Sequence, residues 1–471
     1  MVTFKTFLYD ELTPICVYHK LSTLFKNDLG FLFESVVNSE SGSSSFLFFG
    51  VRERLVHKNS LTYHTDENGV VTELKKDPLS YLEERYKSIN FSFYKKRAEE
   101  IGVGFIDGFI GYIGYDAVKL FEPKLSKSMD ELEDSVNIAD IDLVRPSLVC
   151  VFSHKTNRLT LLSSDPKIKK KLGEISDYLK KPHFLIPLQK SKFDPNTGSF
   201  AFSKSHFFNM VAKSKEMIES GNVFQILMSN RFTQYAKIDF LSFYRTLRSK
   251  NPSPYMFLLN FKNHAIAGSS PEVMVGLKDG NILLRPIAGT RKRGKNILKD
   301  KELEKELIED TKEKAEHLML IDLGRNDVGR VAKVGSVRVT NMMRVEKYSH
   351  VMHMVSDVEA VLDNSCSMFD LFRATFTAGT MTGTPKIKAM ELIAQFEGLK
   401  RSFYSGAVGY FGFDGNMDSA IMIRTSYLDS EKIIFQAGAG IVADSKPELE
   451  YLEVTNKLAA LMSSLEELNQ K

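Results

Sequence analysis

The spacing of apolar residues along the chain predicts several strands. In the first part of the chain, apolar runs at 45–51 and 148–153 have the length and composition of strands and are bounded by polar turns. The same reading predicts later strands at 223–227, 255–259, 282–286, 406–413, 420–425 and 433–437. These strands are grouped together instead of alternating regularly with helices, which predicts an α+β fold.

Helical spacing of apolar residues predicts three helices beyond residue 200. The first follows Ser203, whose hydroxyl can cap it, and ends at Gly221. The second covers 301–322. The third covers 445–461; Ser445 and Glu448 are expected to form a capping box, with Pro447 in the first turn.

A basic, proline-containing stretch at 167–198 is expected to connect two parts of the chain. Its lysines are interpreted as a solvated face, and an Asp-Pro-Asn turn signal follows them. A chain of 471 residues exceeds the size of most single cores, so two domains are expected, 1–190 and 200–471.

Composition narrows the class of protein. A hydrophobic content of 43% excludes a disordered chain, and 63 basic against 59 acidic residues give no indication of nucleic-acid binding. Three scattered cysteines suit a reducing compartment. With no signal peptide and no membrane-spanning run expected, we predict a cytoplasmic protein that binds no membrane.

Two glycine-rich patterns resemble nucleotide-binding motifs only superficially. GTRKRGKN at 289–296 has a basic interior and ends in Asn, where a phosphate loop needs Ser or Thr. GAGIVA at 438–443 lies between a predicted strand and the last helix, too near the end of the chain for a dinucleotide fold. The second is expected to form a turn whose backbone N–H groups bind a small carboxylate.

Carboxylates recur on two of the predicted helices. Glu309, Glu313 and Glu316 are expected on one face of the second helix, and Glu450 and Glu453 on one face of the last. For either helix alone, the simpler explanation of its acidic face is that the face is exposed to solvent. Two such faces together favour an oxygen-ligand site for Mg²⁺ that anchors an anionic substrate.

At these residues the sequence resembles the chorismate-utilising enzymes, and within them the large-subunit branch of the anthranilate synthases. The matching strings, in order, are RPIAGTRKRG (285–294), KEKAEHLMLIDLGRND (312–327), YSHVMH (348–353), FTAGTMTGTPKIKAMELI (376–393), YSGAVGYF (404–411), IRT (423–425) and QAGAGIVADSKPELEYLEVTNK (436–457). The first half matches more weakly, through LFES (32–35) and GYIGYD (111–116).

The resemblance implies an α+β fold in which antiparallel sheets pack as a β-sandwich with helices on the outside. It implies a regulatory and structural region over 1–190 and a chorismate-binding catalytic domain over 200–471. The implied reaction is that of a magnesium-dependent lyase, which converts chorismate and ammonia into anthranilate and pyruvate at the start of tryptophan biosynthesis.

Residue roles follow from the resemblance position by position. It implies Mg²⁺ ligands at Glu316 and Glu453 with Glu450 close by, chorismate contacts at Gly289, Thr290, Tyr404, Arg424, Gly438, Ala439 and Gly440, and catalytic roles for Glu313, His353, Thr380 and Lys457. Glu313 would be the general acid, and His353 would assist loss of pyruvate. On the sequence alone, His353 between two methionines reads more simply as a core histidine.

Two positions discriminate within the family. Ala288 resembles anthranilate synthases, whereas aminodeoxychorismate synthases, the main alternative, often have a nucleophilic Lys there. Gln225 stands where the water-using isochorismate and salicylate synthases have a Lys base. Both positions favour ammonia as the nucleophile.

A feedback site for L-tryptophan is also implied. Ser35, Pro254, Tyr255 and Met256 would line it. The segment NPSPYM at 251–256 is, more simply, a proline-rich turn before a strand, and a non-catalytic tryptophan sensor is a further alternative. The complete lack of tryptophan is compatible with coding bias or with an enzyme that must be translated when tryptophan is scarce.

A partner subunit is expected as well. No cysteine lies in a nucleophile motif, so the chain has no glutaminase of its own. We therefore expect a hetero-oligomer with a glutamine amidotransferase small subunit that supplies ammonia.

Overall fold

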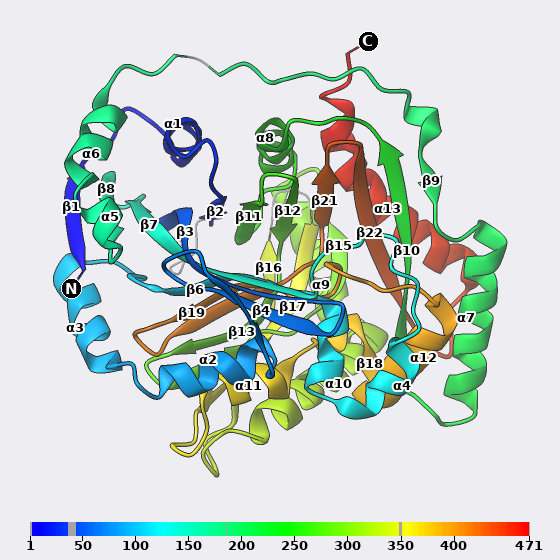
Figure 1. Cartoon of the computed structure of the whole chain (residues 1–471). Coiled ribbons are helices and arrows are strands. Elements are labelled where there is room, and N and C mark those ends of the chain that lie inside the picture. Colours follow the sequence, from blue (N-terminus) through cyan, green and yellow to red (C-terminus); the bar gives the residue numbers. More distant parts are fainter. Residues whose placement is uncertain (1, 36–43, 185, 348–350, 471) are drawn as a thin grey trace.

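The computed structural model describes residues 2–35, 44–184, 186–347 and 351–470 (Figure 1). Within them the chain forms a mixture of helices and antiparallel strands, as the α+β prediction required. The strands before residue 190 are β1 (Thr3–Leu8), β2 (Gly30–Glu34), β3 (Ser44–Lys58), β4 (Leu61–Thr65), β5 (Val71–Leu74), β6 (Gly108–Ile113), β7 (Ile141–Ser153) and β8 (Arg158–Ser163). The helices there are α1 (Pro14–Leu24), α2 (Pro78–Tyr86), α3 (Phe91–Ile101), α4 (Ser126–Met129), α5 (Pro166–Lys169) and α6 (Leu172–Lys180).

The second part of the chain carries the elements of the expected site. Its strands are β9 (Ser199–Phe200), β10 (Gln225–Tyr235), β11 (Tyr255–Asn260), β12 (His264–Ser270), β13 (Val273–Lys278), β14 (Asn281–Leu284), β15 (Ile287–Lys292), β16 (Arg338–Lys347), β17 (Val351–Val361), β18 (Gly383–Thr384), β19 (Ala407–Gly412), β20 (Met417–Ile421), β21 (Thr425–Asp429) and β22 (Lys432–Ile441). Its helices are α7 (Lys204–Glu219), α8 (Phe240–Lys250), α9 (Ile297–Glu309), α10 (Thr311–Gly329), α11 (Met368–Thr375), α12 (Lys386–Glu397) and α13 (Pro447–Glu466), with a short 3₁₀ turn η4 (Gly379–Met381).

Strands from both parts of the chain pair with each other. β2 pairs with β11, with Glu34 opposite Met256, and β6 pairs with β19. These ladders, like the others between the named strands, are antiparallel. One apolar core therefore contains residues of both parts, such as Phe31 and Leu258, which are almost completely buried. The domain boundary near residue 190 stays a prediction.

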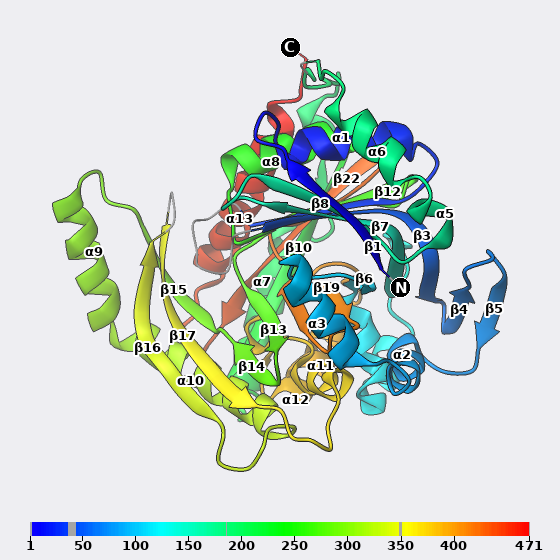
Figure 2. The same ribbon diagram turned by 90° about the vertical axis from the view of Figure 1, so that its left-hand side faces the viewer.

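A second, small core lies under α9. Leu307 of α9 and the two methionines Met352 and Met354 of β17 form it, separate from the main core. Figure 2 shows α9 with β15–β17 at one side of the molecule, projecting from the other elements. This projecting unit carries Gly289, Thr290 and His353 of the expected site, so the site spans two separately packed units.

Some of the predicted elements are confirmed. Helix α7 begins after Ser203, whose Oγ accepts from the His206 N–H at 3.2 Å, and Gly221 follows its end with φ +76°. Pro447 lies in the first turn of α13, as predicted. The predicted strands at 255–259, 282–286, 406–413 and 433–437 agree with observed strands to within a few residues. Those at 45–51, 148–153 and 223–227 are parts of the longer strands β3, β7 and β10.

Other predicted elements are wrong. The helix expected at 301–322 is two helices, because Asp310 ends α9 and caps α10. The strand expected at 420–425 is interrupted at Arg424, which has φ +48° between β20 and β21. The capping box at Ser445 does not form, because Ser445 Oγ instead accepts from the Val442 N–H at 3.1 Å.

One turn prediction is also wrong. Gly438, Ala439 and Gly440 are not in a turn but in β22, paired with β10. The stretch at 167–198, expected to connect two parts of the chain, contains most of α5 and all of α6, and Leu172, Ile175 and Leu179 of α6 are buried. Its apolar residues follow a helical spacing that the dense lysines obscured.

In the part of the chain that the structure describes, no helix is both long and apolar enough to cross a membrane.

Candidate active site

The predicted site residues lie next to one another although they come from many elements. Gly289 and Thr290 are on β15, His353 on β17, and Glu313 and Glu316 on α10. Gly438, Ala439 and Gly440 are on β22, while Glu450, Glu453 and Lys457 are on α13. Thr380 is in η4, Arg424 lies between β20 and β21, and Tyr404 precedes β19. Besides burial, Arg424 and Lys457, from two separate elements, both lower the pKa of His353, so these elements surround one place.

A bulge in β15 places Gly289 against α10. The register between β15 and β17 shifts between Ala288 and Thr290, and Gly289 has φ +65°. A Cβ at this position would lie 2.9 Å from Leu307 Cδ1 and 3.0 Å from Glu313 Oε2. Glycine is therefore required both by the backbone conformation and by the close approach of Glu313.

His353 is held as a neutral imidazole. Its Nδ1 lies 3.2 Å from the Gly289 carbonyl oxygen and 3.0 Å from Thr290 Oγ1. Since a carbonyl can only accept, Nδ1 carries the proton and Nε2 is the nitrogen that can take one up. Burial, with a further contribution from the nearby Arg424 charge, lowers the pKa of His353 to about 4.

Carboxylates from α10 and α13 face one another. Burial and the nearby Glu313, Glu450 and Glu453 charges raise the pKa of Glu316. Burial and the Glu453 charge likewise raise the pKa of Glu450. Lys312 Nζ lies 3.9 Å from Glu316, and Lys457 Nζ lies 2.7 Å from Glu453. Mutual repulsion of this kind is what a bound cation relieves.

The side chains that these two helices offer to a metal are carboxylates, and carboxylate oxygens suit magnesium. Among the residues that the structure describes, no group of three His, Cys, Asp or Glu side chains is arranged to hold a metal ion. Mg²⁺, however, usually takes only one or two protein carboxylates and keeps water and substrate oxygens as its other ligands. Oxygen donors on two facing helices fit that requirement.

The stripe of acids predicted on α10 is shorter than expected. Glu309 belongs to α9, where it is 66% exposed and pairs with Lys305 at 3.7 Å. The prediction failed because it assumed an uninterrupted helix through Asp310. Glu313 and Glu316 remain on one face of α10.

The far end of β22 supplies backbone groups to the same place. Lys457 Nζ donates to the Gly438 carbonyl oxygen at 2.8 Å, so this carbonyl points away from the β10 ladder. A Cβ at Gly438 would lie 3.0 Å from the Tyr404 hydroxyl, and one at Gly440 would lie 2.6 Å from Gln225 Nε2. In a strand, residues two apart face the same way, so Gly438 and Gly440 share this open edge.

One residue of the site was missed by the sequence analysis. Glu272, between β12 and β13, is only 6% exposed and accepts a hydrogen bond from Thr380 Oγ1 at 2.9 Å. Burial raises its pKa to about 8, although Thr380, Arg424 and Lys457 all act in the opposite direction. Glu272 is thus a protonated carboxyl at neutral pH. Its sequence context, a Ser-Ser-Pro-Glu turn between two strands, gave no sign of this burial.

The residues expected to bind tryptophan come together at a different place. The β2–β11 register, with Met256 opposite Glu34, puts Ser35 beside Tyr255. Glu34 Oε2 accepts from Tyr244 at 2.7 Å and from Arg248 at 3.0 Å, and the Tyr255 hydroxyl donates to Asp418 at 3.2 Å. Residues 36–43, which follow Ser35, lie outside the described part of the chain, as do residues 348–350 of the YSHVMH string.

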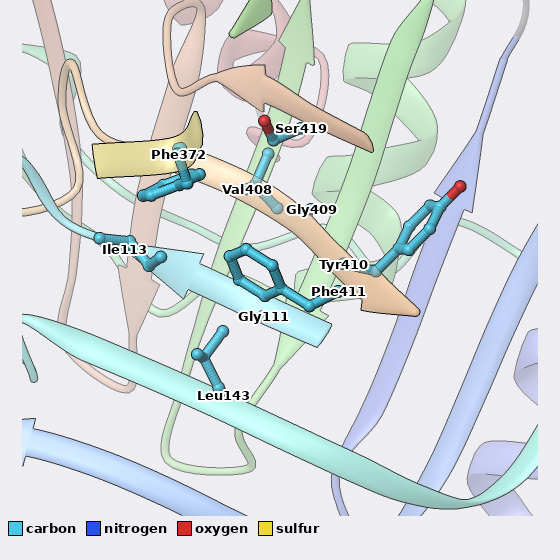
Figure 3. Close-up of a pocket in the computed structure, with 10 residues that line it drawn as sticks. Gly111, Ile113, Leu143, Phe372, Val408, Gly409, Tyr410, Phe411 and Ser419 are labelled. Carbon is cyan, nitrogen blue, oxygen red and sulfur yellow. The ribbon is translucent and has the colours of Figure 1, made fainter. Parts of the chain in front are cut away.

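Two pockets in the described part of the chain lie away from the predicted substrate contacts. A cavity of 10 Å³ lies among Gly111, Leu143, Phe372 and Tyr410 (Figure 3). It is too small for a ring compound and has room for about one water molecule. A crevice of 380 Å³ beside Tyr18 and Lys262 lies at the Gly30–Asn260 end of the β2–β11 ladder, opposite the end at which Ser35 lies.

Comparison with known proteins gives a consistent result. The model of the chorismate binding enzyme family matches residues 10–463. Anthranilate synthase component 1 of Aquifex aeolicus (strain VF5) is 41% identical, over 98% of this chain and 93% of the relative. The component 1 protein of Acinetobacter calcoaceticus is 39% identical, over 98% of this chain and 94% of the relative.

Solved structures agree with the sequence relatives. The crystal structure of anthranilate synthase component I from Streptococcus pneumoniae TIGR4 superimposes with a TM-score of 0.79 at 32% identity, covering 97% of this chain and 98% of the other. The menaquinone-specific isochorismate synthase of Escherichia coli has a TM-score of 0.72 at 16% identity, covering 99% of this chain and 95% of the other. The second likeness shows the shared fold alone.

Proposed function

Because the chain belongs to the chorismate-binding enzyme family, we infer that it acts as the large subunit of anthranilate synthase, a lyase of tryptophan biosynthesis. The observation that carries this inference is identity of 36% to 41% with proteins named anthranilate synthase component 1, over nearly the full length of both chains. Ala288 and Gln225 support it, because neither can act as the lysine nucleophile or base of the related chorismate enzymes.

We further propose that Glu316 and Glu453 hold Mg²⁺, with Glu450 beside them. When bound, the ion would neutralise the ring carboxylate of chorismate and draw electron density from the adjacent ring carbon. The raised pKa values of Glu316 and Glu450 support this assignment, since burial and the neighbouring carboxylates both disfavour their charged forms and a bound cation would favour them.

Substrate orientation is assigned to groups around β22. The Arg424 guanidinium suits a carboxylate, since its fork can bind both oxygens. The N–H groups of Gly438 and Gly440, on the open edge of β22, are proposed to bind the anionic end of the ring together with the Tyr404 hydroxyl, while Ala439 between them pairs with β10. Lys457, already bonded to the Gly438 carbonyl oxygen, is proposed to reach the enolpyruvyl carboxylate.

Two carboxyl groups are proposed to move the protons of the first step. Ammonia attacks ring carbon 2 while the carbon 4 hydroxyl leaves. Glu272, protonated at neutral pH, donates the proton that converts this hydroxyl into water, and Thr380 fixes its orientation. Glu313, whose Oε1 accepts a hydrogen bond from Arg291 at 3.0 Å, is proposed to accept the proton that the new ammonium group must lose. Glu272 is therefore preferred to Glu313 as the acid.

His353 is proposed to act in the second step. As a neutral imidazole it can take the proton from carbon 2 on Nε2, while the enolpyruvyl group leaves and is released as pyruvate. The ring then becomes aromatic, giving anthranilate. Thr290, bonded to Nδ1, keeps the ring of His353 in place.

A partner and a feedback ligand complete the proposal. A glutamine amidotransferase small subunit would supply ammonia, which is supported by the component 1 designation of the relatives and by the lack of a cysteine in a nucleophile motif. L-tryptophan would bind beside Ser35, Pro254, Tyr255 and Met256, where strands of the two parts of the chain pair. A cytoplasmic location is proposed with them.

A product assay tests the function. The purified chain is mixed with chorismate, Mg²⁺ and ammonium, and the blue fluorescence of anthranilate is followed. Fluorescence that depends on all three additions is expected. Conversion of chorismate into non-fluorescent aminodeoxychorismate would contradict the inference.

A further inference from the structure

Arg291, at the end of β15, joins the two helices that meet at Asp310. Its guanidinium donates to Glu306 of α9 at 2.9 Å, to Asp310 at 2.8 Å and to Glu313 of α10 at 3.0 Å. It also donates to the carbonyl oxygen of Thr290 at 3.1 Å. These are four acceptors on three elements, and only the planar fork of an arginine matches such an arrangement.

The two carboxylate oxygens of Asp310 accept hydrogen bonds from different partners. Oδ1 caps α10 by accepting from the backbone N–H groups of Lys312 at 3.0 Å and Glu313 at 3.1 Å. Oδ2 accepts the hydrogen bond from Arg291. Arg291 therefore fixes the residue that sets the direction of the first turn of α10.

The two oxygens of Glu313 are divided in a similar way. Oε1 accepts from Arg291, while Oε2 lies beside Gly289, 3.0 Å from where a Cβ would be. Gly289 carries the carbonyl that holds His353. The arginine thus leaves one oxygen of Glu313 directed toward the predicted substrate contacts. With three acidic partners and only 20% of its side chain exposed, Arg291 belongs to a network, and a network is worth more than an isolated surface pair.

We propose that Arg291 is a positioning residue for the reaction: it aims Oε2 of Glu313 at the substrate and has no contact with the substrate itself. The inference rests on the proposed function for its kinetic consequence, but its structural part concerns only the junction of α9 and α10. A positioning role predicts that its loss slows turnover without weakening substrate binding.

The test compares Arg291→Met and Arg291→Lys with the control Arg293→Met. Arg293 is two residues away and forms an ion pair with Asp300 in the first turn of α9. It is therefore a matched control, an arginine that binds an aspartate at the opposite end of the same helix. We expect kcat of Arg291→Met to fall about 100-fold, the effect of a misplaced reacting group, with KM for chorismate nearly unchanged. Arg291→Lys should recover part of the loss, and Arg293→Met should keep most of the activity. Equal losses in the two methionine variants, or an unchanged kcat in Arg291→Met, would overturn the proposal.

A double-mutant cycle identifies the residue through which Arg291 acts. If it acts through Glu313, the variant Arg291→Met with Glu313→Gln should be no slower than Glu313→Gln alone. Additive losses would show an effect elsewhere and would contradict the proposal.

Hydrogen exchange separates this inference from the proposed function. Without any substrate, Arg291→Met should speed amide exchange in the first turn of α10, at residues 311–316, relative to the wild type and to Arg293→Met. Unchanged exchange there would refute the positioning role. An inactive wild-type protein with the expected exchange would instead refute the proposed function and leave the junction as described.

Discussion

The Thr380 hydroxyl donates a hydrogen bond to Oε1 of Glu272 at 2.9 Å, in a place where Glu272 is only 6% exposed. A hydrogen bond from a hydroxyl favours the charged carboxylate, yet burial dominates and raises the pKa of Glu272 to about 8. The proton on this carboxyl is therefore retained at neutral pH. Such a group, next to the charges of Arg424 and Lys457, is suited to protonate a leaving hydroxyl.

The first prediction concerns Glu272. Glu272→Gln removes the proton donor but keeps the hydrogen-bond acceptor for Thr380, so kcat should fall by about 100-fold to 10,000-fold, the usual contribution of a general acid. In the wild type, the acid must be protonated. Since its pKa is about 8, kcat/KM should fall as the pH rises above 8. The measurement is a pH profile of anthranilate formation.

Glu313→Gln is the control for that profile. If Glu272 is the acid, the residual activity of Glu313→Gln should still fall above pH 8. A Glu272→Gln variant that keeps wild-type kcat, or the loss of the alkaline limb in Glu313→Gln alone, would return the role of acid to Glu313.

The second prediction concerns the carboxylates of α10 and α13. Glu316→Gln and Glu453→Gln should each abolish magnesium-dependent turnover, because each amide removes a charge that a cation needs. Glu309→Gln is a matched control, since Glu309 is exposed at the end of α9 and pairs with Lys305. Calorimetric titration with Mg²⁺ in the presence of chorismate measures binding of the ion independently of activity. Normal turnover in Glu453→Gln would refute the assignment.

The third prediction concerns tryptophan. The chain contains no tryptophan residue, so the indole emission of an added ligand can be followed directly. Added L-tryptophan should bind and inhibit, and Ser35→Ala should weaken binding by roughly 5-fold, the loss of one hydrogen bond of about 1 kcal/mol. Equal affinity in Ser35→Ala and the wild type would remove Ser35 from the ligand contacts. No binding at all would contradict the feedback site.

The fourth prediction concerns the source of nitrogen. The isolated chain should produce anthranilate with ammonium salts and should not use glutamine, because none of its three cysteines lies in a nucleophile motif. Rates with the two nitrogen donors at equal concentration provide the comparison. Glutamine-dependent turnover by the pure chain would show that no partner is needed.

Local signals in the sequence were sufficient for some parts of the fold. Ser203 and Gly221 mark the ends of α7 by capping and by a left-handed conformation, both of which depend on a few neighbouring residues. The break at Asp310 was missed because the acids on both sides of it continue a helical spacing. Arg291, which binds Asp310 from β15, is distant in sequence and gave no signal there.

Burial was the part of the site that could not be read from the sequence. The strings shared with the family led to the residues on α10, β22 and α13, which the structure does bring together. Glu272 lacked any local mark, since its raised pKa comes from surrounding elements that are more than one hundred residues away, such as η4 with Thr380. The strand conformation of Gly438 was missed for a related reason: its partner β10 lies two hundred residues earlier.

The fate of an isotope tests the central claim most directly. The chain is incubated with chorismate, Mg²⁺ and ¹⁵N-labelled ammonium, and the products are identified by nuclear magnetic resonance. The account predicts one equivalent of pyruvate and anthranilate with the label on the amino group next to the ring carboxylate. A label on an amino group para to the carboxylate, or an unlabelled product that has taken its oxygen from water, would contradict it.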